Sequence, residues 1–137
     1  MTAKADLEGW ATTIRAMVVV TGSFDPAVFT RAASLVPTRT WRAGDPRSPR
    51  LPFGCDGWKI DLGERRAAHL EAEADRLFAA LSPSGDAFRA AVGSMGLSAQ
   101  AAFAVFVDGR QRPSVGLRSD QIARLAELGM GLDVDVV

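Results

Sequence analysis

The sequence predicts an α+β fold with two layers, in which a mostly antiparallel or mixed sheet of about five strands has helices packed on one face. Three observations support this class. Segments with strand-like alternation recur along the chain between segments with helical spacing. One hairpin signal, Asp108-Gly109, occurs among these alternating strand and helix segments. The first predicted strand, residues 12–21, has one uniformly apolar face and one mixed face, which is typical of a sheet covered on one side. The expected order of elements is β-α-β-α-α-β-β-α-β.

The first helix has clear start signals directly after the first strand. Asp25 is a good N-cap, and Pro26 occupies the first helical position, where a missing N–H costs nothing. Phe24 and Phe29 have the spacing of a hydrophobic staple across the helix start. The helix is expected to end near Leu35, because a proline follows two residues later.

The centre of the chain predicts one short strand and two helices. Residues 58–62 alternate as a strand, and a helix is expected to begin near Glu64. Ser82-Pro83 interrupts this helix, and a shorter helix follows to about Gly93 or Gly96. The longer helix has one apolar stripe, made by Leu70, Ala74, Leu77, Phe78 and Leu81.

The last third predicts three strands and one helix. Residues 99–107 are apolar on both faces, which is typical of a central strand buried on two sides. A return strand is expected at 113–117, near a sheet edge, because it begins with a proline and contains a glycine. Ser119 caps the last helix, and residues 132–136 form a final strand that is half buried. The inner face of that helix is expected to contain Ile122, Leu125 and Ala126.

Length and composition are those of one globular domain, residues 1–137, with residues 1–11 as a flexible or loosely packed segment. Apolar residues make up 47% of the chain and charged residues 23%, so a disordered chain is not expected. The 16 basic and 16 acidic residues cancel, which disfavours nucleic acid as a partner. No apolar run is long enough to span a membrane and no signal peptide is visible, so a cytoplasmic location is expected.

Residues for catalysis or metal binding are scarce. Tyrosine is absent and His69 is the only histidine, so two common acid–base side chains are nearly missing. The single cysteine, Cys55, has no histidine nearby in sequence and is expected to be a loop thiol without a partner. Asp133 and Asp135 project from one face of the last strand and are candidates for a divalent cation, which Asp61 could join. Acids in such places more often protect an edge strand, so no metal or cofactor is expected. The chain lacks a recognisable nucleophile–base pair, so the sequence favours a non-enzyme and places a hydrolase or transferase third.

The segment 37–58 is the main candidate for a site. Long loops inside compact domains tend to be functional or disordered. Arginine suits phosphate, carboxylate or acidic protein partners, and tryptophan supplies a stacking or interface surface. The alternative is a solvated loop whose arginines pair with nearby acids and whose tryptophans cover the edge of the core. The candidate binding residues are its arginines and tryptophans: Arg39, Trp41, Arg42, Arg47, Arg50 and Trp58.

Four pieces of the chain together resemble a bacterial family known as domain of unknown function 4279. The most specific is the Pro-Thr-x-x-x-x-Gly-Asp pattern in "VPTRTWRAGD", residues 36–45. The others are the Asp25-Pro26 helix start, "PSVGLRSDQIARLAELG" at 113–129 and "LDVDV" at 132–136. Family members often close with an aromatic residue after the last Asp-x-Asp, where this chain has Val136-Val137. The resemblance implies a single-domain α+β fold of bacterial origin, and it brings no reaction and no catalytic residues.

The leading hypothesis is a small soluble non-enzymatic module that binds an unidentified protein partner through the Arg/Trp-rich loop 37–58, as adaptor or immunity proteins do. The alternative is a regulatory domain that holds a small anion beside Arg39 and Arg42. A homo-oligomer is compatible with both. A deep pocket at these residues would favour the anion, and an exposed surface would favour a protein.

Overall fold

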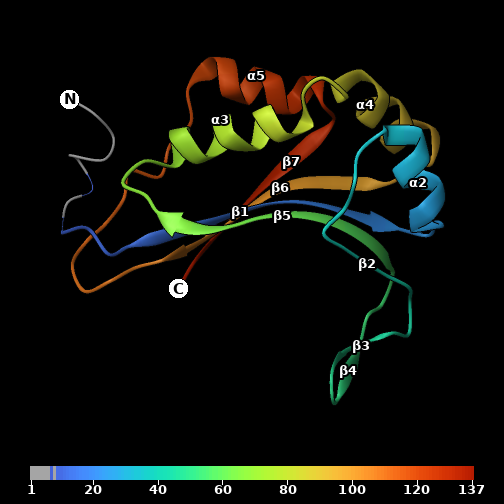
Figure 1. The fold of residues 1–137 in the computed structure, drawn as a ribbon, viewed down its shortest axis with the longest axis horizontal. Coiled ribbons are helices and arrows are strands. Elements are labelled where there is room, and N and C mark those ends of the chain that lie inside the picture. The colour runs from blue at the N-terminus through green and yellow to red at the C-terminus, as the bar shows by residue number, and fades with distance from the viewer. Residues whose placement is uncertain (1–6, 8) are drawn as a thin grey trace.

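A mixed sheet of five strands organises the fold, in the order β2-β5-β1-β6-β7 (Figure 1). The computed structural model describes residue 7 and residues 9–137. Neighbouring strands of the sheet are antiparallel, except that β6 and β7 are parallel. Its strands are β1 (Thr13–Gly22), β2 (Arg39–Trp41), β5 (Asp56–Arg66), β6 (Ser98–Phe106) and β7 (Met130–Val136). A separate two-stranded hairpin consists of β3 (Pro46–Ser48) and β4 (Leu51–Pro52).

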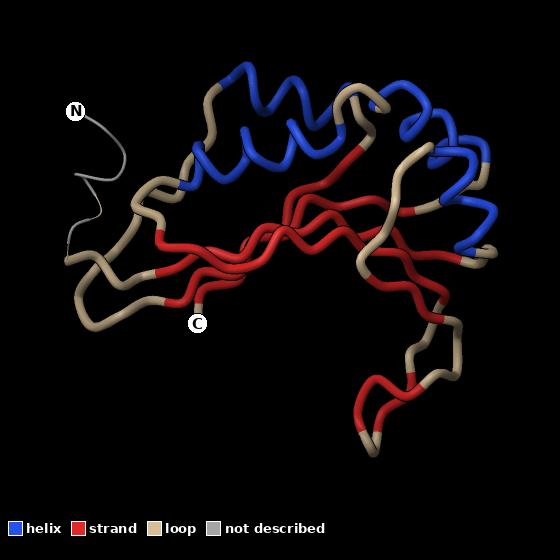
Figure 2. The backbone as a smooth tube through the Cα atoms, viewed as in Figure 1, coloured by secondary structure: helices blue, strands red, loops and turns tan. Residues whose placement is uncertain are grey.

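All four helices of the described residues lie on one face of this sheet (Figure 2). The α3 and α5 helices run along the strands, and α2 and α4 cover one end (Figure 1). The α+β class, the mixed sheet of five strands and the helical layer are therefore confirmed. These helices are α2 (Pro26–Ala33), α3 (Leu70–Leu81), α4 (Gly85–Ser94) and α5 (Ser119–Glu127).

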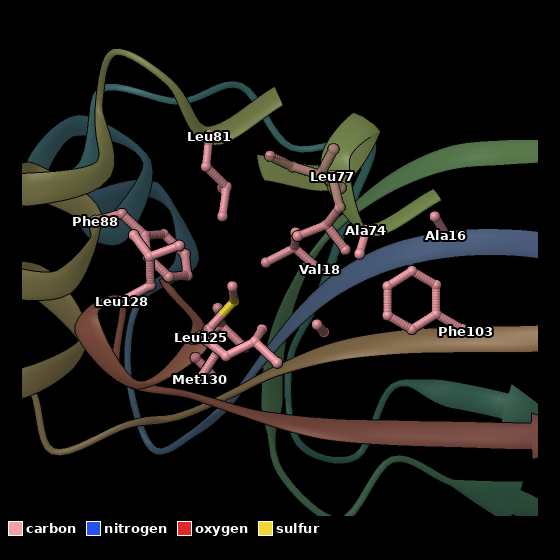
Figure 3. Close-up of a cluster of buried hydrophobic side chains, with 14 of the residues drawn as sticks. Ala16, Val18, Ala74, Leu77, Leu81, Phe88, Phe103, Leu125, Leu128 and Met130 are labelled. Atoms are coloured by element: carbon pink, nitrogen blue, oxygen red, sulfur yellow. The ribbon is translucent and has the colours of Figure 1, made fainter. Parts of the chain in front are cut away.

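The core fills the space between the helices and the sheet (Figure 3). Alternate residues of β1 point into it, including Val18, which meets Leu77 of α3 and Phe103 of β6 in one cluster. Burial of such side chains is the main driving force for folding. An aromatic group closes one end of the core, where Phe29 makes edge-to-face contacts with Trp58 and Phe88.

The start signals of the first helix are confirmed. The Asp25 carboxylate accepts a hydrogen bond from the Ala27 amide at 2.9 Å, and the rings of Phe24 and Phe29 meet edge to face at 5.9 Å. The helix ends at Ala33, two residues before the predicted end. Most of the predicted flexible segment 1–11 lies outside the described residues.

Strand β5 is longer than predicted, and α3 begins at Leu70 instead of near Glu64. The strand continues because β1 offers a pairing partner as far as Arg66, through a bulge opposite Ala16. Gly63 has a φ of 81° at this bulge, a conformation that glycine adopts without strain. The hydrogen bonds between β5 and β1 therefore outweigh the helical propensity of the residues after Glu64.

The predicted return strand at 113–117 is wrong, although the Asp108-Gly109 turn is present. Beyond this turn, Gln111 and Ser114 make only isolated bridges. The Gln111 side chain ties the turn to the start of β1, because its Oε1 accepts from the amides of Ala11 and Thr12 at 2.7 and 3.1 Å. The fifth strand of the sheet is instead β2, at the beginning of the long loop.

The predicted inner face of α5 is rotated. Ile122 and Ala126 are exposed, and Gln121 is buried beside Leu125. The Gln121 amide nitrogen donates to the carbonyl of Glu71 at 2.8 Å and to the carboxylate of Asp75 at 2.9 Å, and these hydrogen bonds compensate for its burial. Hydrophobic spacing predicts Ile122 on the buried face because the pattern assumes that a glutamine such as Gln121 is exposed.

One face of the sheet carries no helix among the residues that the structure describes (Figure 1). We call it the open face. The prediction that 99–107 is buried on both sides is therefore half wrong. Ala101, Phe103 and Val105 face the helices and are buried, whereas Ala104 and Phe106 lie on the open face and are partly exposed. No helix in the described part of the chain is long and apolar enough to cross a membrane.

Candidate functional site

The long loop, residues 37–58, forms a projection with regular structure. Its first part joins the sheet as β2, and residues 46–52 then form the β3–β4 hairpin, which projects on the side of the open face (Figure 1). Backbone hydrogen bonds link Gly44 to Phe53 at 2.9 Å and Phe53 to Asp45 at 2.8 Å at the base of the hairpin. Gly44 has a φ of 90°, so glycine suits the turn into the hairpin.

Asp56 anchors the base of this projection, a role that no sequence pattern predicts. Its buried carboxylate accepts from the amides of Ala43 and Phe24 at 2.8 and 2.9 Å. The Nε of Arg42 donates to it at 3.2 Å. The Ala43 amide first, and then the Phe24 amide, hold the pKa of Asp56 below its ordinary value, because both stabilise the ionised form. One carboxylate thus joins the hairpin to the turn between β1 and α2.

A stacked aromatic pair lies between the hairpin and the sheet. The rings of Trp41 and Phe53 are 4.7 Å apart and nearly parallel, with an interplanar angle of 20°. The indole of Trp41 covers Gly57 of β5 and is only 8% exposed. Its Nε1 is buried and has no hydrogen-bond partner among the described residues. Aromatic stacking, rather than polar contact, therefore holds Trp41 in place.

Two arginines lie against this pair. The guanidinium carbon of Arg39 is 5.8 Å from the centroid of Trp41 and 5.2 Å from that of Phe53. That of Arg47 is 6.0 Å from the Phe53 centroid. Cations within about 6 Å of a ring centroid are attracted by the electron-rich ring face. In the part of the chain that the structure describes, neither arginine forms an ion pair. We call Arg39, Trp41, Arg47 and Phe53 the arginine–aromatic cluster.

The other predicted binding residues have different positions. Arg42 forms ion pairs with Asp56 at 3.2 Å and Asp25 at 3.8 Å, so its charge is partly compensated. Arg50 is exposed in the turn between β3 and β4. Trp58 lies in the core, where its Nε1 donates to Thr30 at 3.1 Å, and it does not reach the surface of the cluster.

The open face extends from this cluster across the sheet. At the β2 edge, Arg39 is paired directly with Lys59 of β5, so two cations are neighbours on the same face. Next to them, Arg15 of β1 donates to both carboxylate oxygens of Asp61 at 3.0 Å. Partial burial raises the pKa of Asp61, but the hydrogen bond from Arg15 and one from the Gly63 amide outweigh it, so the net shift is downward.

Asp133 and Asp135 lie at the opposite edge of the open face. They are exposed and pair in register with Ala102 and Ala104 of β6. Asp61 lies in the row of Asp133 but three strands away, about 14 Å at the usual strand spacing, so it does not join the two aspartates. Within the described residues, no group of three or more His, Cys, Asp or Glu side chains is placed to hold a metal ion.

The candidate catalytic side chains are not brought together. His69 is exposed at the start of α3, and Glu73, one turn further, is buried against the guanidinium of Arg65. Cys55 is a half-buried free thiol beside Asp56. The described residues thus group cations and aromatic rings at the arginine–aromatic cluster, with the indole of Trp41 nearly buried beneath the arginines.

The fold and this surface define a small α+β domain with one covered and one open sheet face. The family model described as "Domain of unknown function (DUF4279)" matches residues 12–137, and the chain belongs to this family. No curated protein and no solved structure matches the chain.

Proposed function

We propose that this domain is a non-enzymatic protein-binding module that contacts an acidic surface of its partner through the arginine–aromatic cluster. The observation that carries the proposal is the uncompensated charge of Arg39 and Arg47 on an ordered projection. A solvated loop would pair its arginines with nearby acids, as Arg42 does with Asp56.

The composition of the cluster supports this role. Arginine is enriched among the residues that dominate interface energetics, and the nearly buried Trp41 supports the arginines from below. Ordering Arg39 and Arg47 against the rings reduces the conformational entropy that they lose on binding. The planar guanidinium group can make two hydrogen bonds to one carboxylate, which adds geometric specificity.

Affinity capture tests this proposal. Immobilised wild-type protein is compared with the Arg39→Ala/Arg47→Ala variant, using lysate of cells that contain the natural partner. The control is Arg31→Ala/Arg89→Ala, which removes two exposed arginines from α2 and α4 in the helical layer. Wild type and control should retain the same protein, and the Arg39/Arg47 variant should lose it. Equal capture by all three would place binding elsewhere on the molecule.

A second candidate is the binding of a small anion, and one observation favours it. Arg39 and Lys59 are like-charged neighbours on paired strands, an arrangement that costs stability unless an anion lies between them. Thermal unfolding in phosphate or small carboxylates tests this candidate. Stabilisation of wild type that disappears in Arg39→Ala/Lys59→Ala would support it, and equal behaviour of the two proteins would reject it.

A further inference from the structure

The open face has opposite charges at its two edges. At the β2 edge are Arg39 and Lys59, with Arg47 on the adjoining hairpin. At the β7 edge are Asp133 and Asp135. Five strands at the usual spacing place these edges about 19 Å apart. In the described residues, neither Lys59 nor either aspartate forms an ion pair.

The middle of the open face is neutral and partly apolar. Arg15 and Asp61 neutralise each other there. The β1 and β6 strands carry small or apolar side chains between the charged edges, and most of them are partly exposed. These are Met17, Val19, Ala102, Ala104 and Phe106. An apolar centre between charged margins is the usual anatomy of a protein interface.

We infer that a second copy of this chain covers the open face, with the two sheets packed face to face about a two-fold axis parallel to β1. The inference rests on the proposed function and assigns the acidic surface to Asp133 and Asp135 of the other copy. Because β1 is the middle strand, this axis places β2 and β5 of one copy against β7 and β6 of the other. The cationic edge of each copy then meets the acidic edge of its partner, twice per dimer.

The register of the sheet agrees with this arrangement. Arg39, Lys59 and Val19 lie in one row of the open face, which ends at Gly131 on β7. Asp133 is the next residue of β7 on that face, about 7 Å along the strand, which an extended arginine can span. A two-fold axis across the strands would instead bring like charges together, which is unfavourable.

The hairpin and the net charge fit the same arrangement. The hairpin projects on the side of the open face, so it would flank the edge of the partner copy and bring Arg47 to it (Figure 1). The formal net charge is zero, so no overall repulsion opposes association of two copies.

Charge reversal with mixing tests the dimer. Two variants, Arg39→Glu/Lys59→Glu and Asp133→Lys/Asp135→Lys, are compared with wild type by sedimentation over a range of concentrations. Wild type should be a dimer that weakens as salt is raised. Each variant alone should show a dissociation constant raised more than about tenfold, because both contacts become repulsive. The control, Arg31→Glu/Arg89→Glu, should behave like wild type.

The decisive measurement uses an equal mixture of the two reversed variants. Both contacts are attractive again in the mixed dimer, so the mixture should associate as wild type does. Circular dichroism of each variant checks that it remains folded. A monomeric wild type at all concentrations, or a mixture of folded variants that does not associate, would overturn the inference. A monomer that still captures a different protein through Arg39 and Arg47 would overturn this inference and leave the proposed function standing.

Discussion

The indole ring of Trp41 occupies the space that a side chain on Gly57 would fill. A methyl group at residue 57 would lie 1.9 Å from Cε2 and Cζ2 of the indole, far closer than any real contact. Glycine at position 57 therefore allows β2 to bring Trp41 down onto the sheet, and Phe53 stacks on the same ring. The arginine–aromatic cluster depends on a residue that has no side chain.

The Gly57→Ala variant should displace Trp41 and loosen the hairpin. We expect a loss of roughly 1–3 kcal/mol in unfolding free energy, as for other changes that overfill a packed site. Hydrogen exchange should quicken in residues 39–53 and stay slow in α3. Gly93→Ala is the control, because Gly93 lies in α4 with open space around its Cα, so alanine there should be neutral or slightly stabilising. Unchanged exchange in the hairpin of Gly57→Ala would contradict this account of Trp41.

Asp56 should make stability depend on acid pH. Its pKa is lowered in the folded state, so its contribution is fully present above the pKa of the unfolded chain and is lost as pH falls through the folded value. Wild type should therefore exceed Asp56→Asn in stability near neutral pH, and the difference should shrink below about pH 4, the range of an ordinary aspartate. Urea unfolding at several pH values measures this difference. Asp86→Asn, at an exposed site on α4, controls for the loss of one charge, and a pH-independent difference for Asp56 would refute its anchoring role.

Truncation to alanine should lower the unfolding free energy strongly at Phe103 and hardly at all at Ile122. Phe103 is 2% exposed in the core, so Phe103→Ala should cost roughly 3–5 kcal/mol. Ile122 is 57% exposed, so Ile122→Ala should stay within about 0.5 kcal/mol of wild type. Chemical denaturation of both variants checks the pair. A large loss in the Ile122 variant would mean that this residue contacts something in solution, such as another molecule.

Cys55 should react with a thiol reagent in the native protein, because it is a half-buried free thiol near the hairpin base. The rate should lie below that of a small free thiol, since partial burial limits access. Cys55→Ser should leave partner capture unchanged. Loss of capture in that variant, with the fold intact, would show that the thiol takes part in binding or in nucleophilic chemistry.

Elements with strong local signals could be predicted without a structure. The Asp25-Pro26 helix start follows from capping chemistry, and β1 follows from a period-two pattern. The density of arginine and tryptophan in residues 37–58 is also visible without a structure, and the binding role of this segment stays a prediction. The family resemblance of the sequence agrees with the match over residues 12–137.

Contacts between residues far apart in the chain follow only from the folded arrangement. The partner of Trp41 is Gly57, and the donors to Asp56 come from two separate turns, contacts that no local pattern encodes. The same holds for strand choice. β7 occupies the edge of β6 beside which the return strand at 113–117 was expected, and β2 adds a strand next to β5 at the opposite edge. Residues 99–107 are apolar on both faces, yet the helices of the described residues cover only one of them (Figure 1). The sequence shows which residues are apolar. The topology determines which apolar surfaces are packed against a helix, and in this fold the helices of the described residues pack on one face of the sheet.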